Sequence, residues 1–223
     1  MELRVAALYD VHANLPALEA VLGEVDSDLV VFGGDLIWGA WPRETLELAL
    51  SLGDRARFII GNTDRDALVG GDESALWVQE RLSREQRELV LAWPSTLSLD
   101  GVLYCHATPR SDTELVGPAS TEARWHEVLD GVEEDLVVCG HTHLQYDEQH
   151  AGHRVVNPGS VGNPTVQPAA WWALIGPDVQ LRTTDYDTRT TADAWRATGF
   201  PRVDFADELL EPLSRERILE LIG

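Results

Sequence analysis

The sequence predicts an α/β fold in which two mixed β-sheets pack face to face as a sandwich, with helices on the outside. Apolar runs rich in strand formers alternate with helical segments through the first two thirds of the chain. The later part contains strand-like runs separated by Gly, Pro and Asp-Gly. The length of 223 residues, 44% of them hydrophobic, suffices for one such domain with a substantial core.

The first part of the chain reads as a βαβαβ unit followed by helices. Strands are predicted at residues 3–10, 29–35 and 56–62, and helical segments at 14–25 and 42–53. Asn14 is the expected N-cap of the first helix, whose first turn contains Pro16. A polar, largely helical stretch then runs to Trp93, with a capping box at Ser83 and Gln86.

The later part of the chain reads as mostly antiparallel β structure. Asp100-Gly101, between two alternating runs, is the strongest hairpin signal. Further strand material is expected within 134–143, 153–164 and 169–187. Residues 190–223 are expected to be a helical extension that packs on the same domain, so we expect a single domain over residues 1–223. The alternative use of the apolar face of this extension is a homo-oligomer contact.

The composition argues against several classes of protein. A formal charge of −21 repels nucleic-acid phosphates and disfavours a general nucleic-acid binder. No apolar run approaches the ~20 residues of a membrane span, and no basic segment precedes an apolar stretch at the N-terminus. We therefore expect no membrane association and a cytoplasmic location. Cys105 and Cys139 each end an apolar run, which favours buried reduced thiols over a disulfide.

Side chains that can bind metal ions follow five of the predicted strands. They are Asp10, His12, Asp35, Asn62, His106, His141 and His143. The carboxyl ends of strands form the ligand crevice of α/β sheets, and residues two apart in a strand face the same side. A glycine precedes Asp35, Asn62 and His141, where the backbone has to bend closely. Each motif alone has an ordinary structural explanation, but five in this order indicate one site.

The set of donors indicates two metal ions. Imidazole, carboxylate and amide groups suit Mn²⁺, Fe²⁺ or Zn²⁺ better than Ca²⁺, which prefers an all-oxygen cage. Seven ligands are too many for one tetrahedral site and suit two sites that share a carboxylate. Two ions ~3.5–4 Å apart are the usual apparatus for in-line displacement at phosphorus.

The order Asp-x-His, Gly-Asp, Gly-Asn, His and Gly-His-Thr-His resembles that of the calcineurin-like metallophosphoesterase superfamily. The resemblance covers about residues 3–187. It extends to the segments DVHANLPALEAVL, CHATPR and NPGSVGNP, which are similar to those of small YfcE-type bacterial and archaeal phosphodiesterases. It implies the αββα metallophosphoesterase fold and a metal-dependent phosphoesterase, expected to be a phosphodiesterase that hydrolyses small phosphodiesters.

The resemblance also implies roles for individual residues. One metal ion would be bound by Asp10, His12 and His143, the other by Asn62, His106 and His141, and Asp35 would bridge both. Mn²⁺ is the expected ion, with Fe²⁺, Zn²⁺ or Ni²⁺ as alternatives, and a hydroxide between the ions would attack phosphorus. The expected catalytic residues are Asp35, Asn62, Asp64 and His141. The candidate substrate contacts are Asn14, Arg65 and Arg110, with Asn157 a further candidate for supporting the site.

Two positions depart from the family pattern. Ala13 stands where the family usually has Gly, which the loop should tolerate. Thr63 stands where many relatives have a His that protonates the leaving group, and a threonine hydroxyl is no acid near neutral pH. Losing a positioned general acid costs ~10²–10⁴ in rate, and two nearby cations should keep the neighbouring Asp64 ionised. We therefore expect a preference for good leaving groups and slow turnover of alkyl monoesters.

Two other functions are weighed against this one. A non-catalytic scaffold or binding module is the main alternative, because a eukaryotic scaffold protein of the retromer coat resembles this fold and lacks the catalytic His. A scaffold, however, has no need for seven intact ligand positions. Dinucleoside polyphosphate hydrolases and protein phosphatases typically carry Gly-Asn-His-Glu, whereas this chain has Gly-Asn-Thr-Asp.

Overall fold

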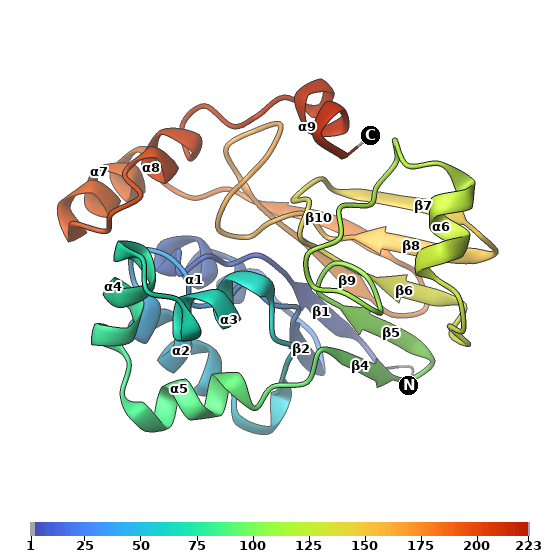
Figure 1. Ribbon diagram of the computed structural model, residues 1–223, viewed down its shortest axis with the longest axis horizontal. Coiled ribbons are helices and arrows are strands. Elements are labelled where there is room, and N and C mark those ends of the chain that lie inside the picture. Colours follow the sequence, from blue (N-terminus) through green and yellow to red (C-terminus); the bar gives the residue numbers. More distant parts are fainter. Residues whose placement is uncertain (1–2, 223) are drawn as a thin grey trace.

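The strands assemble into two mixed sheets, as shown by a computed structural model that describes residues 3–222 (Figure 1). Within these residues, one five-stranded sheet has the order β10-β9-β1-β2-β3 and the other the order β4-β5-β6-β8-β7. The first sheet comprises β1 (Val5–Leu8), β2 (Leu29–Phe32), β3 (Ala56–Phe58), β9 (Ala170–Ile175) and β10 (Gln180–Thr184). The second comprises β4 (Thr96–Leu99), β5 (Val102–Cys105), β6 (Leu136–Val138), β7 (Tyr146–His150) and β8 (His153–Asn157). The predicted fold class is confirmed.

The helices lie outside the two sheets (Figure 1). The helices between β1 and β4 are α1 (Leu15–Glu24), α2 (Pro42–Leu50), α3 (Asn62–Val69), α4 (Glu73–Arg81) and α5 (Arg84–Leu91), with the 3-10 turn η1 (Gly53–Arg55). Later in the chain come α6 (Glu122–Val128), α7 (Thr188–Thr198), α8 (Asp204–Glu208) and α9 (Arg215–Ile222). Asn14 caps α1 through Ala17 N–H, and Ser83 and Gln86 form the capping box of α5, as predicted.

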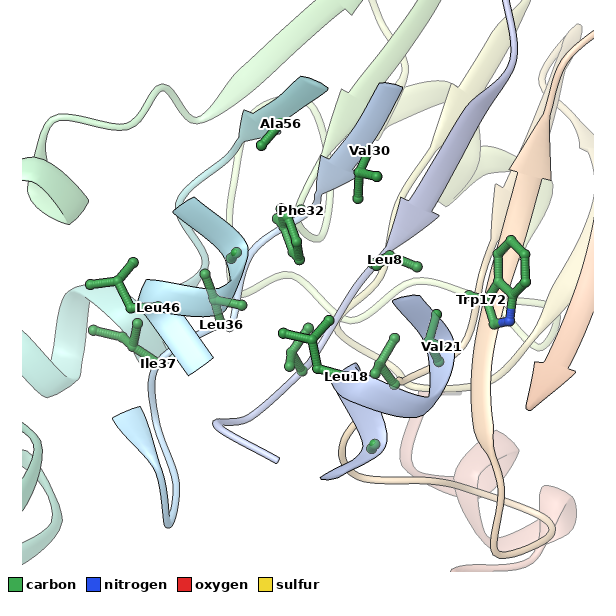
Figure 2. Close-up of a cluster of buried hydrophobic side chains, with 14 of the residues drawn as sticks. Leu8, Leu18, Val21, Val30, Phe32, Leu36, Ile37, Leu46, Ala56 and Trp172 are labelled. Carbon is green, nitrogen blue, oxygen red and sulfur yellow. The ribbon is translucent and has the colours of Figure 1, made fainter. Parts of the chain in front are cut away.

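Alternation along β1 divides the core into two layers. Val5 and Ala7 face the second sheet, where they join a buried cluster with residues such as Val138. Ala6 and Leu8 face the helices and join the larger cluster shown in Figure 2. Because both faces of β1 are buried, this strand is rigidly held, and the loop after it starts from a fixed point.

The second sheet contains both parallel and antiparallel pairs. The predicted hairpin is present, since β4 and β5 are antiparallel and both Asp100 (φ 51°) and Gly101 (φ 77°) adopt left-handed conformations in the turn. The pairs of β5 with β6 and of β6 with β8 are parallel, so this sheet is mixed, while most pairs formed by the strands of the later part of the chain are antiparallel, as expected. The chain returns from β5 to β6 through α6, a connection that the strand-like runs did not reveal. The consequence is that β5 and β6 end at the same edge.

The helices α7 and α8 pack on the rest of the chain through aromatic side chains, and α9 packs through Ile218 and Ile222. Trp195 of α7 is 1% exposed and makes edge contacts with the rings of Trp41 and Phe200. Phe205 of α8 packs against Trp38, with ring centroids 4.8 Å apart. The helical extension expected from residue 190 onward is therefore present in the described residues and is anchored by a buried cluster.

Two smaller expectations concern the thiols and the membrane. Cys105 and Cys139 are buried free thiols, as predicted. Among the helices of residues 3–222, none is long and apolar enough to cross a membrane.

Replacing Trp195 tests whether the C-terminal helices belong to the same cooperative unit as the sandwich. Trp195→Ala removes a fully buried ring and should cost about 3–5 kcal/mol of unfolding free energy. We expect a single calorimetric transition at a lower Tm, with Val203→Ala as the control because Val203 is 49% exposed in the same segment. A normal main transition preceded by a separate small one would contradict the single-domain prediction.

Candidate metal centre

Loops at the ends of five strands bring the predicted ligands together. Their ligand atoms form two groups, each within 4.8 Å: Asp10, His12 and His143 in one, and Asp35, His106 and His141 in the other. Asn62, the first residue of α3, lies against the second group, with its amide oxygen 3.1 Å from His106 Nε2. The structure thus brings together the residues of the two expected ligand sets, with Asp35 in the second group.

The backbone at the ligands is left-handed, which the strand-based argument did not foresee. Asp10, His12, Asp35, His141 and His143 have φ values of 53°, 47°, 55°, 65° and 57°. Non-glycine residues seldom adopt this conformation, and each instance costs ~1–3 kcal/mol unless the surroundings enforce it. The ligands therefore lie in sharply turning loops beyond the strands, and strand alternation is not what makes Asp10 and His12 converge.

Glycines make this close approach possible. A Cβ atom on Gly61 would lie 2.1 Å from Asp35 Oδ1, and one on Gly140 would lie 2.5 Å from Asp10 Oδ2. A Cβ on Gly34, whose φ is 97°, would lie 2.5 Å from His106 Nδ1. The glycines that precede three of the ligands therefore leave space for the ligands themselves, as the sequence predicted.

The two carboxylates are oriented in the same way. One oxygen of each accepts a backbone hydrogen bond: Asp10 Oδ2 from His141 N–H at 3.0 Å, and Asp35 Oδ1 from Thr63 N–H at 2.9 Å. The other oxygen faces the imidazoles. Asp10 Oδ1 lies 3.3 Å from His143 Nε2, and Asp35 Oδ2 lies 3.4 Å from His106 Nε2. Asp10 Oδ1 is buried and has no hydrogen-bond partner within residues 3–222, so an acceptor is left available for a cation.

Two of the imidazoles are fixed through their outer nitrogens. His106 Nδ1 lies 3.0 Å from Gly33 O, and His143 Nδ1 lies 3.0 Å from Asn163 O. A carbonyl accepts only, so each Nδ1 carries a proton, and in the neutral form of the ring Nε2 presents its lone pair to the centre. His12 Nε2 lies 3.1 Å from His143 Nε2. Converging nitrogen and oxygen lone pairs fit a divalent cation.

The amide of Asn62 lies in the same cluster. One of its two terminal atoms is 3.1 Å from each of His106 Nε2, His141 Nδ1 and Asp112 O. An NH₂ group at that position would donate to these acceptors, so the protein contacts alone favour the NH₂ group inward. With a cation between the groups, the amide oxygen would face inward as a ligand.

The buried charges perturb one another strongly. Burial favours the neutral form of His106, but the charge of Asp35 and its hydrogen bond prevail and raise the pKa of His106 to about 10. Burial likewise raises the pKa of Asp35, but the positive charge of His106 holds it well below its usual range. Burial lowers the pKa of His12 to about 4, with a further contribution from His143. Without a metal ion a proton thus stabilises the carboxylates, and metal binding would release it.

Asp64 does not face the ligand cluster. Its carboxylate is completely buried and accepts hydrogen bonds from the N–H groups of Leu36 (2.8 Å), Ile37 (2.9 Å) and Gly61 (3.1 Å). Burial, and then the charge of Asp35, raise the pKa of Asp64 to about 7. Asp64 thus holds the Asp35 loop against α3, and the catalytic role that the resemblance implies for it stays a prediction.

The predicted substrate contacts are engaged elsewhere in this structure. Asn14 donates to Gly162 O at 2.8 Å and to Tyr186, besides capping α1. The Arg65 guanidinium pairs with Asp112. That of Arg110 pairs with Glu114 at 2.7 Å and Glu127 at 2.8 Å. Their roles as substrate contacts stay predictions, because no free guanidinium faces the cluster from either position.

Other residues support the centre. Asn157 donates to Gly140 O at 2.9 Å and to Thr142 Oγ1 at 3.0 Å, which fixes the loop that carries His141. Thr63 supports Asp35 through its backbone, while its Oγ1 is buried without a hydrogen-bond partner in the described part of the chain. The support of His143 by Asn163, within the NPGSVGNP segment, was not recognised from the sequence.

Phe205 is the neighbour of the centre that sequence reasoning missed most clearly. Its ring lies 5.8 Å from that of His12, in an edge-on arrangement. It comes from α8, almost two hundred residues further along the chain than His12. No motif marks Phe205, so only the folded chain reveals the contact.

Comparison with known proteins agrees with this geometry. The model of the calcineurin-like phosphoesterase superfamily domain matches residues 3–176. An uncharacterized protein of Methanocaldococcus jannaschii, MJ0912, is 26% identical over 196 residues, which are 72% of this chain and 76% of that protein. A metallophosphoesterase structure from Sphaerobacter thermophilus is 25% identical, with a TM-score of 0.80 over 94% of this chain and 98% of that chain.

YfcE, a phosphoesterase from E. coli, shares the fold with a TM-score of 0.53 and 20% identity, over 82% of this chain and 100% of YfcE. The resemblance to YfcE-type proteins expected from the sequence is therefore confirmed at the level of fold. The match to the family model covers most of the chain and includes every predicted ligand. The chain belongs to the calcineurin-like phosphoesterase superfamily.

Proposed function

We propose that this phosphoesterase hydrolyses small phosphodiesters with the help of two divalent cations. The expected ions are Mn²⁺, and the alternatives are Fe²⁺, Zn²⁺ or Ni²⁺. The observation that carries the proposal is the pair of adjacent ligand groups with Asp35 between His12 and His106. Asp35 Oδ2 lies 3.9 Å from His12 Nε2 and 3.4 Å from His106 Nε2. Asp35 is thus positioned to serve both groups, as a bridging ligand must.

The residues of the chain prepare the site for reaction. Asp10, His12 and His143 would hold one cation, and Asn62, His106 and His141 the other, with Asp35 shared. When bound, the cations would supply a hydroxide at neutral pH and neutralise negative charge on the phosphorus oxygens. The backbone hydrogen bonds of Asp10 and Asp35, and those of the His106 and His143 rings, keep the ligands in place before substrate arrives.

Thr63 determines which substrates react well. It lies at the N-terminus of α3, and its N–H holds Asp35. A hydroxyl at this position cannot give a proton to an alkoxide leaving group near neutral pH. We therefore propose that the protein is a diesterase for small esters whose leaving group departs without a proton. We further propose that it acts in the cytoplasm.

Mn²⁺ should stabilise the protein through these ligands. At ~100 times the dissociation constant, binding adds about 2.7 kcal/mol, which corresponds to roughly 5–10 °C in Tm for a chain of this size. We expect this Mn²⁺-induced shift in differential scanning calorimetry to be largely lost in Asp10→Asn and Asp35→Asn. Asp26→Asn is the matched control, because Asp26 has a 93% exposed side chain. Equal shifts in all four proteins would contradict the assigned ligands.

The proposed activity can be measured after chelator treatment. We expect Mn²⁺ to restore hydrolysis of bis-p-nitrophenyl phosphate, with p-nitrophenyl phosphate a much poorer substrate. Mn²⁺ binding without turnover of either compound would refute the diesterase proposal and favour the scaffold alternative.

The Thr63→His variant tests the role given to this position. Because the backbone N–H is retained, the bond to Asp35 should persist while the new imidazole supplies an acid. We expect kcat/KM for an alkyl phosphate monoester to rise at least ~10-fold, within the ~10²–10⁴ that a general acid contributes. Thr63→Val is the control and should leave hydrolysis of bis-p-nitrophenyl phosphate unchanged. No gain in Thr63→His would show that leaving-group protonation does not limit the reaction.

A further inference from the structure

A cavity of about 260 Å³ adjoins the metal centre on the side of His141 and His143. Its floor is formed by these two ligands, and its walls by aliphatic side chains, among them Leu115, Leu213 and Leu221. Glu208 is the one acidic side chain among its described lining residues. The cavity therefore combines candidate metal ligands with an apolar chamber beside them.

Most of the apolar wall comes from the C-terminal segment, which lies outside the stretch matched by the family model and contributes Leu213, Ile218, Leu221 and Ile222. In Figure 1 this segment (red) crosses the top of the view from α7 to α9. The link between α8 and α9 is fixed by a hydrogen bond from Val166 N–H to Leu213 O at 2.9 Å. In α9, Ile218 is 4% exposed and packs in a cluster with Leu144. The wall is thus a built part of the structure.

One residue joins this wall to the metal centre. Asn163 accepts a hydrogen bond from His143 Nδ1 through its carbonyl and donates from its side chain to Glu208 Oε2 at 3.1 Å. The same helix, α8, places Phe205 against His12. The C-terminal helices therefore contact both the candidate ligands and the cavity, and a group that enters the cavity would lie beside His141 and His143.

We propose that the C-terminal segment forms a specificity pocket that receives one apolar ester group of the phosphodiester, either an aryl or a branched alkyl group. This inference rests on the proposed diesterase function. A cavity of ~150 Å³ holds benzene, so about 260 Å³ accommodates a substituted ring. The aliphatic walls stabilise such a group by removing it from water. The carboxylate of Glu208 disfavours a substrate with a second anionic group at this position.

The proposed pocket predicts the ratio of kcat/KM for two diesters that share the same leaving group. Methyl p-nitrophenyl phosphate and phenyl p-nitrophenyl phosphate both release p-nitrophenolate, and they differ in the group that the pocket would hold. A single methylene in an apolar pocket is worth ~10–200-fold. We expect the Mn²⁺-loaded enzyme to prefer the phenyl ester by at least ~10-fold in kcat/KM.

Variants at exposed wall positions test the pocket without disturbing the core. Leu213 and Leu221 are 46% and 53% exposed, so Leu213→Glu and Leu221→Glu should fold. Each should reduce the phenyl preference, which is the ratio of the two kcat/KM values, at least ~10-fold, because a carboxylate in the wall opposes burial of the ring. Leu89→Glu is the matched control, because Leu89 is 43% exposed on α5 and does not line the cavity. An unchanged preference in both wall variants would overturn the proposal.

A binding measurement separates failure of the pocket from failure of the proposed activity. Dimethylphosphinate and methyl(phenyl)phosphinate are monoanions like diesters, but their P–C bonds are not hydrolysed. By calorimetric titration of the Mn²⁺-loaded protein, we expect at least ~10-fold tighter binding of the phenyl compound, lost in Leu221→Glu. Tighter binding without turnover of either diester would retain the pocket and refute the diesterase. Turnover without any phenyl preference, in rate or binding, would refute the pocket alone.

Discussion

The structure depends on two buried carboxylates that share one small space. Asp10 and Asp35 are 0% and 2% exposed, and each uses one oxygen for a backbone N–H and turns the other toward histidines. Two such charges in an apolar interior are costly unless positive charge lies between them. The left-handed loops, the glycines and the hydrogen bonds of the ligand rings are all arranged around this requirement. We infer that divalent cations meet it in the working protein.

The positions of the ligand-bearing loops are set by the strands that precede them. Because β1 is buried on both faces and β5 and β6 run parallel, the loops after these strands start from fixed points at neighbouring edges. Asp64 then ties the Asp35 loop to α3 with three hydrogen bonds. Strain of ~1–3 kcal/mol at each left-handed ligand is thus balanced by packing elsewhere. The C-terminal helices add a further layer, since they cover His12 and line the cavity beside His141 and His143.

The sequence was sufficient to predict the fold class and the gathering of the ligands, because strands, hairpin and ligand motifs are all local signals. It did not indicate which pairs of the second sheet are parallel, since strand direction depends on connections that span the sheet. The hydrogen bonds of Asp64 to the Asp35 loop could not be predicted, because side-chain direction at a helix start cannot be read from the order of residues alone. The contact of Phe205 with His12 could not be predicted from the sequence, because no local pattern encodes a contact between residues so far apart in the chain.

The number of metal ions per chain tests the central claim most directly. After chelator treatment and equilibrium dialysis against Mn²⁺ at neutral pH, elemental analysis of the wild-type protein should give two ions per chain. A value of two would agree with two ligand groups that share Asp35. A value of one or none would contradict a two-metal centre, and with it the mechanism proposed for this phosphoesterase.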